Sequence, residues 1–153
     1  MKKKKIVLAV ASLLGIFLIG CTILAFFVYD HNLIRVSTFY YRTDIDGNLW
    51  TKADYLPLDS ITYNDRGELV VYRLQKRKGW FSEEYYVEDI PLDYYYNDNK
   101  EMVYRKDGFV RVITFSLEEG DQLVKKPELG LQNGVTVKWE SGERGEYDAA
   151  VWD

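Results

Sequence analysis

The sequence has few of the residues that small exported domains use for covalent or metal-based stabilisation. Among 153 residues there is one cysteine, Cys21, and one histidine, His31. One cysteine allows no intramolecular disulfide, and an exported domain without disulfides is typical of a Gram-positive envelope. One histidine, at the edge of a long apolar run, argues against a Ser-His-Asp site, a Cys-His site or a zinc site. We interpret His31 as an interfacial polar residue.

The acidic residues also form no pattern that predicts catalysis or metal binding. Asp44-Ile45-Asp46-Gly47-Asn48 resembles the start of a calcium loop, but Tyr55 occupies the position of the bidentate glutamate and the glycine comes two positions early. A hairpin turn explains the same residues. The pairs Glu83-Glu84 and Glu118-Glu119 are interpreted as acids on solvated turns rather than as a glycosidase pair. We therefore expect a non-enzymatic protein with no catalytic residues, no cofactor and no metal.

Positive charge is scarce beyond the N-terminus. The chain has 20 Lys+Arg and 24 Asp+Glu, and four of the bases are Lys2 to Lys5. All the acids and the other 16 bases lie beyond Tyr29, so the later part of the chain carries a charge of about −8. A nucleic-acid partner would need a basic stripe, and this balance argues against one.

What the N-terminus does have is a long apolar run. No charged residue interrupts residues 6–29. As a helix these residues would be about 36 Å long, enough to cross a hydrocarbon core of about 30 Å. The lysines before the run predict a cytoplasmic N-terminus, and residues from 30 onward are expected outside the cell membrane. The interpretation is a single-pass anchor in contact with the lipid bilayer through residues 6–29.

Cys21 leaves a second interpretation open. Leu18-Ile19-Gly20-Cys21 has the form of a lipobox, in which cleavage before the cysteine is followed by its lipidation. A lipidated cysteine usually leads into a polar tether, whereas here the apolar run continues through Phe26 and Phe27 to Tyr29. An uncleaved anchor is therefore favoured, and a lipoprotein at Cys21 is the alternative.

The outer part of the sequence predicts strands separated by turns. We expect a cytoplasmic stub at 1–5, the anchor at 6–29, one β-domain at 30–140 and a loose tail at 141–153. Predicted strands cover residues 35–41, 69–74, 84–90, 102–104, 109–115, 122–124 and 135–139. Gly120-Asp121 and Asn133-Gly134 are predicted turns with positive φ. The fold class is mostly β, a small antiparallel barrel or sandwich after one transmembrane helix.

Clustered aromatic residues are the candidates for a partner interface. Tyr85, Tyr94 and Tyr95 belong to tyrosine runs, of which strand alternation should send about half into the core. Trp80 and Phe81 lie in the predicted turn after the basic segment 76–79, where a solvated hairpin would carry small polar residues. They either contact a partner or fold back onto the domain.

One ordered set of short motifs resembles the membrane-proximal part of the periplasmic adaptor, or membrane fusion protein, family. Pro57 and Ile61 match the start of a strand in that family, and Val71-Tyr72 match the strand that follows. Further matches in a turn and in the last hairpin are Leu117, Gly120, Asp121, Val124, Leu131, Gly134 and Val137. The matches cover roughly 80 residues.

The resemblance implies an accessory protein that docks on the outer face of a transporter, an ABC-type exporter or permease involved in efflux. The chain differs from the family because it has no lipoyl half-motifs and no helical hairpin, so it would be a reduced form. The alternative is an envelope binding or immunity module that holds a peptide, a sugar or a bacteriocin.

Overall fold

The computed structural model describes residues 2–41, 54–79, 82–104, 108–114, 116–128 and 130–140. The chain divides into two compact units, Met1–Leu33 and Ile34–Asp153. The predicted turn at 44–48 and the predicted tail at 141–153 lie outside the described residues.

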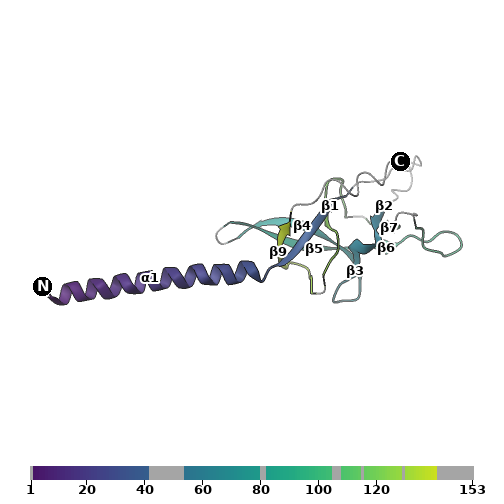
Figure 1. Ribbon diagram of the computed structural model, residues 1–153. Helices are drawn as coiled ribbons and strands as arrows, with labels where there is room; N and C mark the ends of the chain where they lie inside the picture. The colour runs from purple at the N-terminus through teal and green to yellow at the C-terminus, as the bar shows by residue number, and fades with distance from the viewer. Residues whose placement is uncertain are drawn as a thin grey trace. The chain divides into compact units, whose positions relative to one another are not determined.

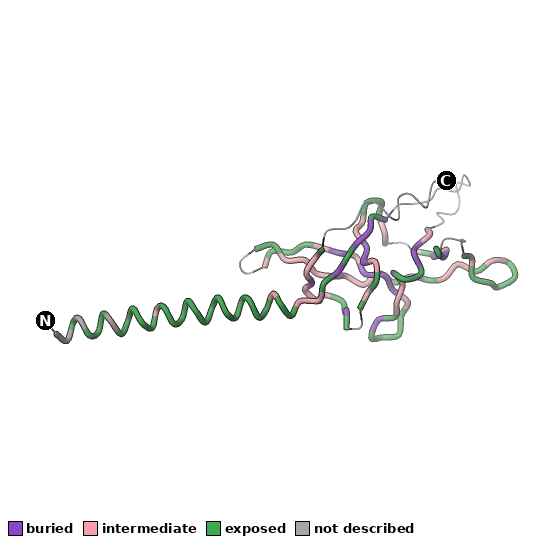
Figure 2. The backbone as a smooth tube through the Cα atoms, in the orientation of Figure 1, coloured by how far each residue is buried: buried purple, intermediate pink, exposed green. Residues whose placement is uncertain are grey.

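The first unit is one helix, α1, which covers Lys2–His31 (Figure 1). Its segment Ile6–His31 is apolar and long enough to span a membrane, and it is exposed along its length (Figure 2). The hydroxyls of Ser12 and Thr22 donate to carbonyl oxygens four residues earlier, at 2.9 Å each, so these polar groups are satisfied within the apolar run. The helix passes through Cys21 and ends two residues after the predicted Tyr29.

The second unit is built of short strands, which confirms the predicted mostly-β fold. The strands are β1 Ile34–Tyr40, β2 Asp54–Pro57, β3 Ile61–Tyr63, β4 Leu69–Lys78, β5 Glu83–Pro91, β6 Asp93–Tyr94, β7 Phe109–Ile113, β8 Gln122–Val124 and β9 Thr136–Glu140. A single 3-10 turn, η1 Leu58–Ser60, joins β2 to β3.

Five of these strands close into a barrel. β4 pairs with β5, β5 with β9, β9 with β1, β1 with β8, and β8 returns to β4 through the pair Arg73 and Leu123. The sequence predicted antiparallel strands, and the pair β1–β9 differs because it is parallel. This pairing joins the first and last described strands, so the N-terminal strand completes the wall of the domain.

A second sheet, in the order β2-β7-β6, covers part of the barrel's outer wall. The domain consequently has two apolar cores. Val70, Tyr72 and Leu74 of β4 pack inside the barrel with Val87 of β5. Val71 belongs to the other core, between the barrel wall and the second sheet, whose members are Phe39, Tyr41, Leu56, Val71, Ile90, Leu92, Val110, Val112 and Leu123. Strand alternation explains this division, since neighbouring residues of β4 point to opposite faces.

Several predicted elements differ in detail from the observed ones. Residues 102–104 form two isolated bridges, Tyr96 to Met102 and Tyr104 to Val110, instead of a strand. Glu83 and Glu84 lie in β5 and not on a turn, opposite Lys78 and Arg77 of β4. Three short strands, β2, β3 and β6, were not predicted.

The two glycines that the sequence predicted in turns, Gly120 and Gly134, have positive φ. Gly120 has φ +93° before β8, and Gly134 has φ +80° before β9. A side chain at either position would be strained whatever the space around it. These turns begin the last two strands of the barrel at defined residues.

Candidate functional site

Three exposed tyrosines, an exposed methionine and one partly buried tyrosine form a surface beside the second sheet. This tyrosine face consists of Tyr63, Tyr94, Tyr96, Met102 and Tyr104. Tyr63 is the last residue of β3 and Tyr94 the last residue of β6. The other three members lie in the isolated bridges, Tyr96 paired with Met102 and Tyr104 paired with Val110. Tyr63, Tyr96 and Tyr104 are 65%, 54% and 50% exposed, which is far more than core aromatics.

Tyr94 lies within electrostatic reach of the other three phenols of this face. Burial raises the pKa of Tyr94, and the neighbouring phenols of Tyr63, Tyr104 and Tyr96 raise it further because phenolates would repel one another. The Tyr104 hydroxyl lies 3.4 Å from the sulfur of Met102. Tyr94 itself packs against the inter-sheet core, so the exposed rings surround an anchored one.

Two of the tyrosines begin copies of the same seven-residue hairpin. The first hairpin, residues 63–69, reads YNDRGEL, and the second hairpin, residues 96–102, reads YNDNKEM. Each places its tyrosine across from the final apolar residue, Tyr63 opposite Leu69 and Tyr96 opposite Met102. Both loops project from the part of the domain that carries β3, β6 and β7 (Figures 1 and 2).

The two hairpins share their hydrogen bonds as well as their sequence. In the first, the side-chain oxygen of Asn64 accepts from the backbone N–H groups of Arg66 and Glu68, at 3.0 and 2.9 Å. In the second, Asn97 accepts from the N–H groups of Asn99 and Glu101 at the same two distances. Gly67 and Lys100 occupy the same place with φ of 75° and 62°.

The asparagine side chain of each hairpin also donates a hydrogen bond to the glutamate near the end of the same hairpin. The Asn64 amide donates to Glu68 at 2.9 Å, and the Asn97 amide donates to Glu101 at 3.3 Å. Asparagine is favoured in turns because its side chain can form a hydrogen bond with the backbone two residues further along the chain. The repeat was not recognised in the sequence, although the pattern Y-N-D-x-x-E followed by Leu or Met was there to find it.

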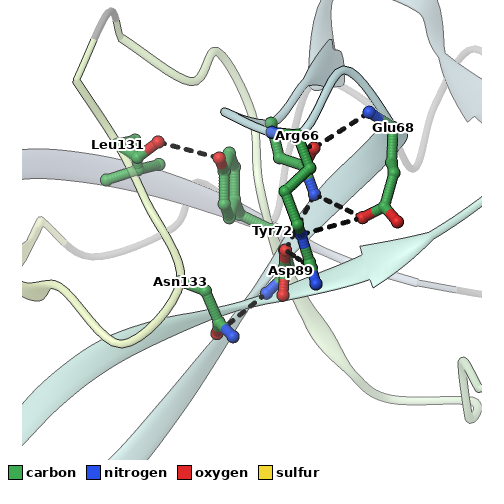
Figure 3. Close-up of polar contacts among 7 residues, drawn as sticks. Arg66, Glu68, Tyr72, Asp89, Leu131 and Asn133 are labelled. Carbon is green, nitrogen blue, oxygen red and sulfur yellow. Dashed lines mark hydrogen bonds and ion pairs between the residues drawn. The ribbon is translucent and has the colours of Figure 1, made fainter.

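The first hairpin is tied to the end of the barrel by a polar cluster (Figure 3). Asp89 accepts from Asn64 and from Arg66, at 3.1 Å each, and the Asp89 side chain is only 9% exposed. Its backbone N–H donates to Asn133 at 3.4 Å. These contacts hold the first hairpin in place relative to the loop that precedes β9.

Tyr72 extends this cluster into the barrel interior (Figure 3). Its hydroxyl donates to the carbonyl oxygen of Leu131 at 2.7 Å. Burial raises the pKa of Tyr72, and the nearby carboxylates of Asp89 and Asp65 raise it further. The hydroxyl therefore stays protonated at neutral pH and acts as a structural donor.

The interface residues predicted from the sequence lie in different places. Tyr94 is part of the tyrosine face, whereas Tyr85 packs against Trp139 with ring centroids 5.3 Å apart. The Tyr95 ring is covered by the Arg111 guanidinium at 4.0 Å from its centroid. Trp80 and Phe81 lie outside the described residues. Tyr63 and Tyr104 were not among the interface residues predicted from the sequence, and Tyr96 is the third tyrosine of the run at 94–96, of which Tyr94 and Tyr95 were predicted.

A second charged cluster has a structural role in the barrel wall. Arg73 is bonded to Glu88 at 2.8 Å and to Asp121 at 3.0 Å, which joins β4, β5 and the turn before β8. Burial alone would lower the pKa of Arg73, but its hydrogen bonds to these carboxylates outweigh that effect and raise it. The guanidinium is thus fully committed to partners of its own chain.

Within the described part of the chain, no three Cys, His, Asp or Glu residues are grouped closely enough to hold a metal ion. No family model, no curated protein and no solved structure matches the chain.

Proposed function

We propose that the protein is a membrane-anchored, non-enzymatic accessory protein whose β-domain docks through the tyrosine face on the outer side of a membrane transporter. The observation that carries this proposal is the exposure of three grouped tyrosines, Tyr63, Tyr96 and Tyr104, in a domain attached to an apolar helix. Tyrosine is enriched at protein interfaces because it supplies a large contact area with few rotamers to immobilise.

The anchor supports a partner that also lies in the membrane. Residues 6–29 would keep the β-domain at the bilayer surface, so that docking on another membrane protein becomes nearly intramolecular and weak contacts suffice. The basic residues Lys2 to Lys5 favour an outward orientation of the domain. The motifs that resemble the adaptor family point to an ABC-type permease as the partner.

An envelope module that captures a free peptide, sugar or bacteriocin is the second candidate. The same tyrosine face favours it, because aromatic rings with neighbouring amide and carboxylate groups suit such ligands. The two candidates differ in whether the bound partner resides in the membrane.

Co-purification tests the proposal. Full-length protein is extracted in a mild detergent, and a permease is sought among the proteins that accompany it. The double variant Tyr63→Ser and Tyr96→Ser should reduce that permease at least about fivefold, since hot-spot tyrosines each contribute 1 kcal/mol or more, about a factor of five. Both side chains are more than half exposed, so the melting temperature should change little.

The matched control is Tyr40→Ser. Tyr40 is 45% exposed but lies on β1 of the barrel wall, and it should leave co-purification unchanged. A permease that accompanies the double variant as well as the native protein would overturn the proposal.

A further inference from the structure

The charges of the two hairpins restrict what their tyrosines, Tyr63 and Tyr96, bind. The two hairpins and β6, residues 63–69 and 93–102, contain five acidic and two basic residues, a net charge of −3. The acids are all exposed: Asp65, Glu68, Asp93, Asp98 and Glu101. Arg66 is already bonded to Glu68 and Asp89, so it offers little to a partner. An acidic or phosphorylated partner would be repelled by this surface.

The corresponding aspartates of the two hairpins have their charge available. Glu68 and Glu101 are each bound by the asparagine of their own hairpin. Within the described residues, neither Asp65 nor Asp98 forms an ion pair or a side-chain hydrogen bond. The repeat thus places one such carboxylate two residues after Tyr63 and two residues after Tyr96, Asp65 in the first hairpin and Asp98 in the second.

Three tyrosine rings elsewhere in the described part of this domain lie under cations. Arg111 lies over Tyr95 at 4.0 Å, Arg77 over Tyr86 at 5.1 Å and Lys76 over Tyr85 at 5.3 Å from the ring centroids. The negative face of an aromatic ring attracts a cation within about 6 Å.

The exposed rings of the tyrosine face differ from these three pairs. Among the described lysines and arginines, none lies over Tyr63 or Tyr96. The face therefore combines open aromatic rings with unpaired carboxylates, a combination suited to Lys and Arg side chains.

We infer that the tyrosine face binds a basic polypeptide segment, with Lys or Arg side chains over Tyr63 and Tyr96 and with Asp65 and Asp98 pairing with the same cations. This inference rests on the proposed function, since it names the chemistry of the docking segment: a basic extracytoplasmic segment of the membrane partner. It commits the surface to a cationic peptide rather than to a neutral sugar.

Peptide binding to the full-length protein in nonionic micelles tests the inference. The probes are three labelled peptides of equal length, with lysine and arginine, with glutamine, or with glutamate at the same positions among serines and alanines. Fluorescence anisotropy should show that the basic peptide binds at least about tenfold more tightly than the glutamine peptide, a difference of 1.4 kcal/mol. The affinity should fall as salt is raised, because exposed charges are screened.

Two variants separate the aromatic from the electrostatic contribution. Tyr63→Ser with Tyr96→Ser should remove binding of the basic peptide, and Asp65→Asn with Asp98→Asn should weaken it about fivefold. The charge-matched control is Glu118→Gln with Glu119→Gln, which neutralises two exposed acids of the turn before β8. This control should bind like the native protein.

The outcomes distinguish the inference from the proposed function. Equal binding of the three peptides, or binding of a chitin oligosaccharide but no peptide, overturns the inference. If the permease still co-purifies in a manner that depends on Tyr63 and Tyr96, the docking function stands without it. A basic peptide that binds as expected while no permease co-purifies supports the inference and overturns docking on a transporter.

Discussion

Tyr72 shows how one residue joins the apolar interior to the polar end of the barrel. Its ring is 1% exposed and lies among Val70, Leu74 and Val87, while its hydroxyl reaches Leu131. A buried carbonyl group that loses its hydrogen-bond donor still carries the free-energy penalty of desolvation, which no hydrogen bond then offsets. The hydroxyl therefore matters more to stability than its single hydrogen bond suggests.

Replacing Tyr72 with Phe should lower the free energy of unfolding by about 1–2 kcal/mol, because the Leu131 carbonyl is left without this donor. Urea unfolding of the protein in micelles, followed by tryptophan fluorescence, measures the change. Tyr40→Phe is the control, since the Tyr40 hydroxyl is exposed and accepts from Gln122 at the surface. Equal stability of the native protein and the Tyr72 variant would contradict the role assigned to the hydroxyl.

The same variant should alter the response to alkaline pH. The folded-state pKa of Tyr72 lies above its ordinary value of 10.0, so the unfolded chain loses this proton first. The contribution of Tyr72 is fully present below pH 10.0 and is lost as the pH rises through the folded pKa. Unfolding free energies measured from about pH 9 upward should decline less steeply for Tyr72→Phe than for the native protein. Parallel curves would show that Tyr72 does not titrate differently in the two states.

At the scale of elements, the longer strands were predictable and the shorter ones were not. The β-branched and aromatic runs of β1, β4, β5 and β7 predicted strands, because such residues favour a pleated and half-buried surface. β2, β3 and β6 have two to four residues, and two of them contain Pro or Asp. β2 and β6 are held extended by pairing with β7, which comes later in the chain, whereas β3 is held by the hairpin that it forms with β4.

The pairing between segments that are distant in the chain also could not be predicted from the sequence. Nothing in β1 indicates that Ile34 lies opposite Val137, more than a hundred residues away, or that the two strands are parallel. The two cores could have been anticipated from the adjacent buried valines Val70 and Val71, since an uninterrupted apolar run is typical of a strand covered on both faces. Tyr94 was an interface candidate from the sequence alone, whereas its nearness to Tyr63 and Tyr104 could be found only in the fold.

The two hairpins provide a matched pair for measuring how context changes one turn. Asn64→Ala should cost about 2–3 kcal/mol, because it removes the bonds to Arg66 and Glu68 and leaves the buried Asp89 with one partner fewer. Asn97→Ala should cost about 1 kcal/mol, because the second hairpin is exposed and its groups can bond water. Urea unfolding of both variants gives the comparison. Equal costs would show that the tie to Asp89 contributes nothing.

At the scale of the whole molecule, a membrane anchor would determine how strong the proposed docking must be. A domain confined to the bilayer surface meets a membrane partner at a high effective concentration, so contacts as weak as a few cation–π pairs suffice. A lipid on Cys21 and an uncleaved helix would both confine the domain. They differ in what remains of the N-terminus.

We predict that Cys21 is not lipidated and that the helix remains uncleaved. α1 continues without a break from Cys21 to His31, and this segment contains Ile23, Leu24 and Phe27, each more than half exposed. Cleavage before Cys21 would leave these side chains at the start of the mature chain, where a lipoprotein needs a polar tether. Intact-mass measurement of the membrane-extracted protein should therefore give a chain that includes residues 1–20. A mature chain that begins with a diacylglyceryl-modified Cys21 would contradict the prediction, and Cys21→Ser should leave both mass and membrane retention otherwise unchanged.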